Sequence, residues 1–149
     1  MTNVIAVASS KGGVGKTTTS FSLAAAASAW GSVMVIDLDP SISLTTQMKL
    51  PITGATIEDV VTGKCALEDA LVATDEGLLA VPGSRQMYRY QVTHEQLTDI
   101  FGAAMGEVDH IILDTRPALE ALSGPMQFAT KVVIPTYLAT PDVSQLAGL

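Results

Sequence analysis

Residues 11–18, with the sequence KGGVGKTT, constrain the fold more than any other feature of the chain. An apolar run at residues 4–8 precedes them and is typical of a buried strand. Residues 17–30 are rich in alanine and contain no glycine or proline, so they predict a helix that Gly31 would end. A second apolar run at residues 33–37 follows a crossover long enough to make the two strands parallel. This part of the chain therefore predicts one complete βαβ unit, with the glycine-rich stretch as its first loop.

The rest of the chain continues the alternation of strands and helices. Apolar runs predict three more strands, at residues 77–81, 108–114 and 131–135. Helices are expected from Thr56, over residues 66–72, from Thr93 to about residue 105, and before the last strand. Strands that alternate with helices form a doubly wound, mostly parallel sheet with flanking helices, so the predicted fold class is α/β. Because the chain has 149 residues and 48% of them are apolar, residues 1–149 are expected to form a single domain.

The glycines of the first loop indicate a binding site for phosphate. Gly12, Gly13 and Gly15 let the backbone turn tightly and bring its N–H groups close to an anion at a helix N-terminus. Lys16 would reach the β- and γ-phosphates of a nucleotide, and the hydroxyl of Thr17 would hold Mg²⁺. Ser10 stands where the general pattern has its first glycine, which makes this a deviant P-loop. The predicted nucleotide-binding residues are Lys11, Gly12, Gly13, Val14, Gly15, Lys16, Thr17 and Thr18.

Two carboxylates follow other predicted strands and indicate a metal site. Asp39 comes after the second strand and Asp114 ends the strand at residues 108–114. Because the carboxyl ends of parallel strands share one edge of the sheet, both acids can converge on a magnesium ion bound by Thr17. Asp39 is also placed to orient an attacking water. The alternative for either acid alone is a helix cap or a solvated turn residue.

Three segments together carry a family resemblance: residues 11–18, the stretch DLDP at 37–40 and the stretch VDHIILDT at 108–115. They strongly resemble the ParA/MinD family of deviant Walker ATPases, which have a P-loop NTPase fold. ParA-type (Soj-like) partitioning proteins are the most similar members. In this family the lysine that matches Lys11 reaches across an ATP-sandwiched dimer, and the aspartate that matches Asp39 is needed for hydrolysis. The resemblance thus implies catalytic roles for Lys11, Lys16 and Asp39, and a magnesium site at Thr17, Asp39 and Asp114 in which the carboxylates act through water.

The resemblance also implies a function. The expected activity is slow, partner-stimulated ATP hydrolysis with ATP and Mg²⁺ as cofactors. The expected setting is an ATP-dependent homodimer in the cytoplasm, which segregates plasmid, phage or chromosomal DNA with a ParB-like or other partition partner. Two alternatives stay open: a weakly hydrolysing, nucleotide-dependent regulatory switch, and a MinD-like positioning ATPase.

The sequence departs from the family pattern in three places. Ser41, Ile42 and Ser43 replace the usual glutamine, glycine and asparagine, which puts the hydrolysis rate in doubt. Arg116 replaces the first of two prolines and is expected either to sense the nucleotide or to face solvent. Family members continue beyond the position that matches Leu149, so we expect a chain truncated at its C-terminus. The alternative is a natural minimal ATPase whose missing strands are supplied by another chain.

Charge and composition restrict the partners. With eight Lys and Arg against 15 Asp and Glu, the net charge is −7, so DNA binding, which is possible in full-length family members, is not supported by this acidic chain. A MinD-like membrane role needs a C-terminal amphipathic helix that does not occur before Leu149, and no membrane partner is expected. The single cysteine, Cys65, excludes an iron–sulfur electron carrier. Residues 85–90 interleave arginines with tyrosines and are expected to form a solvated loop, with a DNA, protein or nucleotide contact as the alternative.

Overall fold

A computed structural model describes residues 1–137 of the chain. These residues form a six-stranded sheet in the order β3-β4-β2-β5-β1-β6, in which only the β3–β4 pair is antiparallel. The strands are β1 (Asn3–Val7), β2 (Val33–Asp37), β3 (Val72–Ala73), β4 (Leu79–Val81), β5 (His110–Asp114) and β6 (Lys131–Val133). The predicted α/β class with a mostly parallel sheet is therefore confirmed.

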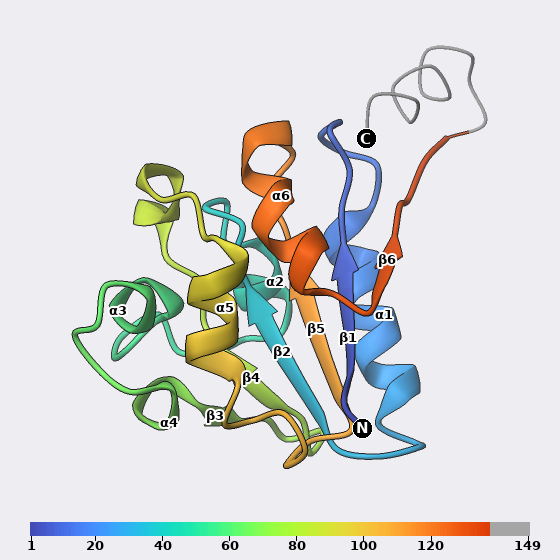
Figure 1. The fold of residues 1–149 in the computed structure, drawn as a ribbon. Helices are drawn as coiled ribbons and strands as arrows, with labels where there is room; N and C mark the ends of the chain where they lie inside the picture. Colours follow the sequence, from blue (N-terminus) through green and yellow to red (C-terminus); the bar gives the residue numbers. More distant parts are fainter. Residues whose placement is uncertain (138–149) are drawn as a thin grey trace.

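Seven helical segments accompany the strands in the described part of the chain (Figure 1). They are α1 (Lys16–Ala27), α2 (Ser43–Gln47), α3 (Ile57–Val61), α4 (Leu67–Ala70), the 3₁₀ helix η1 (Arg85–Arg89), α5 (His94–Phe101) and α6 (Leu119–Phe128). No helix among residues 1–137 is long and apolar enough to cross a membrane.

Helices cover both faces of the sheet because the strand side chains alternate between two apolar clusters. Met34 and Ile36 of β2 belong to a cluster that packs against α3, α4, α5 and α6. Val33 and Val35 of the same strand belong to the opposite cluster, which includes residues of α1 and α2. Since successive side chains of a strand point to opposite faces, β2 is buried on both sides. This is the doubly wound arrangement that the sequence predicts.

Several element boundaries differ from the predictions. α1 ends at Ala27 because the Trp30 N–H bonds to the carbonyl of Ala27 and closes a tight turn before Gly31. α5 ends at Phe101, whose carbonyl accepts from the N–H groups of both Ala104 and Met105 in a turn. The predicted helix starts at the capping boxes of Thr56 and Thr93 are confirmed.

Two other predicted segments are confirmed only in part. The helix expected over residues 66–72 is only α4, because Val72 and Ala73 leave it to pair with β4. Residues 85–90 are not simply a solvated loop: the Ser84 hydroxyl caps η1 by accepting from the N–H of Gln86, and Met87 is 2% exposed. The family resemblance also implies the start of a further helix at residues 144–149, which lie outside the described residues.

Candidate functional site

The predicted phosphate loop connects β1 to α1 and needs glycine at two positions. Gly13 and Gly15 have φ values of 74° and 92°, in the left-handed region that other residues avoid. A Cβ atom at Gly12, Gly13 or Gly15 would meet no heavy atom within 4 Å, so the space over the loop is open. The loop backbone is thus both turned and accessible, as close approach to an anion requires.

The N-terminus of α1 favours negative charge. Gly15 is the N-cap residue, no side chain caps the helix, and its first turn has no acidic residue. The unpaired N–H groups and the helix dipole therefore keep their positive potential at this end. Lys16 adds a full positive charge although its side chain is only 7% exposed.

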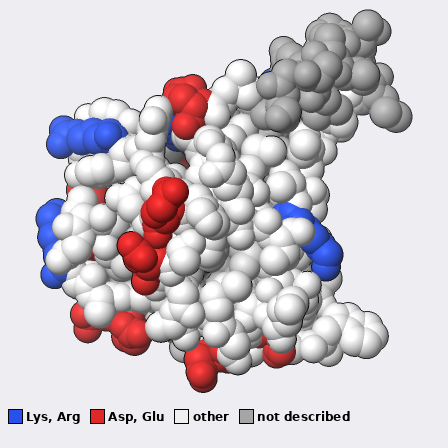
Figure 2. Space-filling model, in the orientation of Figure 1, with Lys and Arg blue, Asp and Glu red and all other residues white. Residues whose placement is uncertain are grey.

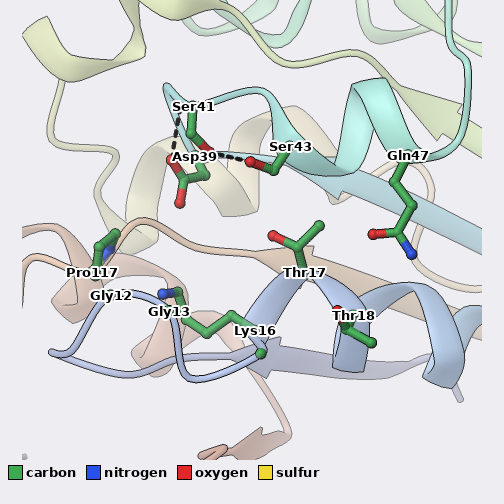
Figure 3. A pocket seen from close by; sticks show the side chains of 11 residues that line it. Gly12, Gly13, Lys16, Thr17, Thr18, Asp39, Ser41, Ser43, Gln47 and Pro117 are labelled. Atoms are coloured by element: carbon green, nitrogen blue, oxygen red, sulfur yellow. Dashed lines mark hydrogen bonds between the residues drawn. The ribbon is translucent and has the colours of Figure 1, made fainter.

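A cavity of about 550 Å³ lies over this end of α1. Its lining combines the phosphate loop with residues that follow β2 and β5 (Figure 3). The lining residues are Gly12, Gly13, Gly15, Lys16, Thr17, Thr18, Asp39, Ser41, Ser43, Gln47 and Pro117. The carboxyl ends of three parallel strands thus meet at one cavity, as the sequence predicts.

Asp114, the last residue of β5, lies fully buried beneath the first turn of α1. Its carboxylate accepts hydrogen bonds from the Thr17 hydroxyl at 2.9 Å and the Ser20 hydroxyl at 2.8 Å. Burial raises the pKa of the Asp114 carboxyl, and the two hydroxyls and the Lys16 charge oppose that rise. The helix that carries the phosphate loop is therefore held against the acid predicted to bind magnesium.

Asp37 is a second buried carboxylate and the register partner of Asp114 in the β2–β5 pair. It accepts hydrogen bonds from the backbone N–H and the hydroxyl of Thr45, at 2.8 and 2.7 Å. The same hydroxyl accepts from the N–H of Gly83 at 2.8 Å, and a Cβ at Gly83 would lie 2.9 Å from Cγ of Asp37. Asp37 therefore ties β2 to α2 and, through Thr45, to Gly83 beyond the end of β4, and it does not line the cavity.

Asp39 lines the cavity and is 8% exposed. Its Oδ1 atom accepts a hydrogen bond from the N–H of Ser41 at 2.8 Å, and the hydroxyls of Ser41 and Ser43 lie 2.9 Å apart (Figure 3). Ile42, between them, has a φ of 51°, an unfavourable value for a β-branched residue. The unusual residues at 41–43 thus hold one oxygen of the predicted water-orienting acid.

Three of the predicted site residues, Lys11, Val14 and Asp114, do not line this cavity. Val14 is 8% exposed, with its side chain in the interior. The Lys11 ammonium lies 5.8 Å from the ring centre of Tyr137. The Arg116 guanidinium donates to the carbonyl of Tyr88 at 3.1 Å and lies 4.0 Å from Glu120. Its side chain is 15% exposed and so does not simply face solvent, and its nucleotide-sensing role remains a prediction. A nucleotide contact by Lys11 remains a prediction.

Sequence reasoning missed residues that support the site. Ser20 follows Thr17 by three positions on one face of α1, and this helical spacing could have indicated a shared partner. Thr45 and Gln47 lie in α2, a helix the sequence did not predict, so no local signal marked them. Tyr137, whose hydroxyl contacts the loop, is brought there only by the pairing of β6 with β1.

The oxygen ligands at this site fit magnesium. Thr17 and Asp114 provide adjacent oxygens, and Asp39 lines the same cavity. No group of three or more acidic, His or Cys side chains able to hold a metal occurs among residues 1–137. At nucleotide sites Mg²⁺ is usually bound by a few protein oxygens, and water and phosphate oxygens complete its coordination.

The buried carboxyl of Asp37 makes the free energy of unfolding of the nucleotide-free chain depend on pH. Burial raises the pKa of its carboxyl to about 6 from 3.8, and the nearby Asp114 charge adds to the rise. The folded state thus disfavours the ionised form, so the free energy of unfolding should fall by about 3 kcal/mol in total as pH rises from about 4 to about 7. We expect the Asp37→Asn variant to lose this pH-dependent part of the free energy of unfolding. Urea unfolding of the variant and the wild type at several pH values across that range measures the difference. An equal pH dependence in both proteins would contradict it, and Asp75→Asn, at an exposed loop acid, is the control.

The fold and the loop define a P-loop NTPase, and comparison with known proteins gives the family. A family model described as an AAA domain matches residues 2–148. Septum site-determining protein MinD from Synechocystis is 31% identical over 159 aligned positions, covering 100% of this chain and 59% of that protein. Chromosome partitioning protein ParA from Caulobacter vibrioides is 33% identical over 160 positions, covering 96% of this chain and 60% of its own length. The chain belongs to the ParA/MinD family of deviant Walker ATPases.

Solved structures of similar fold contain nucleotides. Cobyrinic acid a,c-diamide synthase from Mycobacterium smegmatis, with bound ADP and magnesium, is 31% identical with a TM-score of 0.85, and the match covers 99% of this chain and 66% of that one. A plasmid partition protein from Borrelia burgdorferi bound to AMPPNP is 26% identical with a TM-score of 0.87, and the match covers 98% and 67%. This chain spans about 60% of the length of the MinD and ParA proteins that it matches.

Proposed function

We propose that this protein binds ATP with Mg²⁺ at the cavity over α1 and hydrolyses it slowly, as a ParA-type partitioning ATPase. The observation that carries the proposal is the convergence of the phosphate loop, Asp39 and the Thr17–Asp114 pair at one cavity. Nucleotides with magnesium in related structures support the same cofactors here.

Each group has a role that follows from its position. The N–H groups of the loop and the Lys16 ammonium bind the β- and γ-phosphates. Thr17 would hold the magnesium ion and Asp114 would act on it through water, and bound magnesium would neutralise charge on the phosphate oxygens. Asp39, which lies across the cavity from the loop (Figure 3), would hold the attacking water by its carboxylate.

The biological output we propose is segregation of DNA by an ATP-dependent dimer in the cytoplasm, with a partition protein that stimulates turnover. Sequence similarity to a chromosome partitioning ParA supports this role. Direct DNA binding by this chain is not part of the proposal, because its net charge is −7 and lysines and arginines stand at separate places on the face in Figure 2.

Two alternatives have support of their own. Similarity to MinD along the whole chain supports a positioning ATPase. The hydrogen bond from the Ser41 N–H to Asp39 supports a nucleotide switch with very weak hydrolysis, because one carboxylate oxygen is already engaged. Turnover and cargo, rather than nucleotide binding, distinguish the three functions.

The test is calorimetry of ATP binding with magnesium, together with light scattering and phosphate release on the same samples. Binding in the micromolar range, a doubling of molar mass with ATP and slow phosphate release are the expected results. A well-folded chain that binds no ATP would contradict the proposal. Binding and dimerisation without phosphate release, even with a stimulating partner, would favour the switch.

A further inference from the structure

The segment after β6 runs beside the phosphate loop. β6 pairs in parallel with β1, and the N–H of Ala8 donates to the carbonyl of Val133 at 3.0 Å. Because β1 leads into the loop, the chain that leaves β6 continues next to it. This places Tyr137 within reach of residues 11–13.

The side chain of Tyr137 contacts the loop at two points. Its hydroxyl donates to the carbonyl of Gly13 at 2.7 Å, and the Lys11 ammonium lies 5.8 Å from its ring centre. The tyrosine is 55% exposed, so its hydroxyl could be hydrated by solvent, yet it binds the backbone of a loop with left-handed φ at Gly13. Neither Tyr137 nor Lys11 lines the nucleotide cavity, so the contact is made from outside that cavity.

The contact fixes the orientation of one peptide group. The described residues contain no cis peptide bond, so the carbonyl of Gly13 and the N–H of Val14 point in opposite directions. A carbonyl held toward Tyr137 directs the N–H of Val14 away from Tyr137. Glycine at position 13 would otherwise let this peptide rotate, because glycine restricts φ and ψ less than any other residue.

We propose that Tyr137 is a positioning residue for nucleotide binding, which orients the Gly13–Val14 peptide and holds the Lys11 side chain on the outer side of the loop. The inference rests on the proposed ATP site and deepens it. The hydroxyl acts on the peptide, and the ring acts on Lys11 by a cation–π contact. Tyr137 itself touches no substrate.

Tyr137→Phe tests the hydroxyl. The expected result is about a fivefold rise in the Kd for magnesium-ATP, which corresponds to about 1 kcal/mol, with little change in turnover of the bound nucleotide. The unfolding midpoint in urea should stay within error, because an exposed hydroxyl is removed; a merely structural role would move that midpoint instead. Tyr88→Phe is the matched control, since Tyr88 is 57% exposed and does not contact the loop.

Tyr137→Leu tests the ring. We expect a further twofold to fivefold rise in Kd relative to Tyr137→Phe at low salt. In a Lys11→Met background the Phe and Leu variants should bind equally, because the ammonium that contacts the ring is gone. Unequal binding in that background would overturn the role given to the ring.

A measurement without nucleotide separates this inference from the proposed function. The Gly13 carbonyl and Val14 amide resonances of the nucleotide-free chain should shift in Tyr137→Phe and stay in place in Tyr88→Phe. Unchanged resonances and an unchanged Kd would overturn the inference and leave the ATP site intact. Shifted resonances in a chain that binds no ATP would support the contact and overturn the proposed function.

Discussion

Replacing Lys16 with alanine is expected to weaken binding of magnesium-ATP about a thousandfold, or about 4 kcal/mol. The side chain is 7% exposed and lies over the loop at the cavity. A charge-assisted hydrogen bond at such a partly desolvated site stabilises binding several times more than the same bond in water. In the variant, the negative charge of the phosphates would have no positive partner at this position. Calorimetry at fixed magnesium and salt concentrations measures the loss.

The controls for this prediction separate charge from folding. Lys16→Met keeps most of the apolar stem and should lose binding to a similar extent, since the missing group is the ammonium. Lys64→Ala removes a lysine whose side chain is 61% exposed and should bind as the wild type does. A folded Lys16→Met chain that binds ATP within tenfold of the wild type would show that the phosphates lie elsewhere.

Replacing Asp39 with alanine is expected to lower kcat for ATP hydrolysis about a thousandfold while leaving the Kd for ATP within a few-fold. The carboxylate lines the cavity, but the loop N–H groups and Lys16 supply the phosphate contacts. Removing a group that acts on the attacking water should therefore affect the chemical step and spare ground-state binding. Single-turnover phosphate release measures this step apart from product release.

Asp99→Ala is the matched control for Asp39→Ala, because Asp99 is an exposed carboxylate on α5 that does not line the cavity. It should hydrolyse ATP at the wild-type rate. Wild-type turnover by Asp39→Ala would mean that another group orients the water. Equal, near-zero turnover by both wild type and variant would support the nucleotide switch.

The sequence predicted the parts of the site that depend on local pattern. Apolar runs marked β1, β2 and β5, and glycine spacing marked the phosphate loop, because buried strands and left-handed turns restrict the choice of residues locally. Asp39 was placed at the cavity by the same reasoning.

What the sequence did not predict depends on contacts between distant segments. Ser20 meets Asp114 across 94 residues, and Tyr137 meets Gly13 across 124. The position of Arg116 was also open, because it depends on the carbonyl of Tyr88 in η1. The lengths of α1 and α5 were overestimated for a different reason: local turns after Ala27 and Phe101, and not helix propensity, set where these helices end.

The strand order has a consequence for synthesis. β1 and β2 follow each other in the sequence but do not pair; both pair with β5, which is made last of the three. A nascent chain therefore carries two apolar strands with open edges until residues 110–114 emerge from the ribosome and insert between them. Because β5 ends in Asp114, the strand that closes the centre of the sheet also brings in the carboxylate that holds Thr17 at the edge of the cavity, so ATP should bind only after the centre of the sheet has closed.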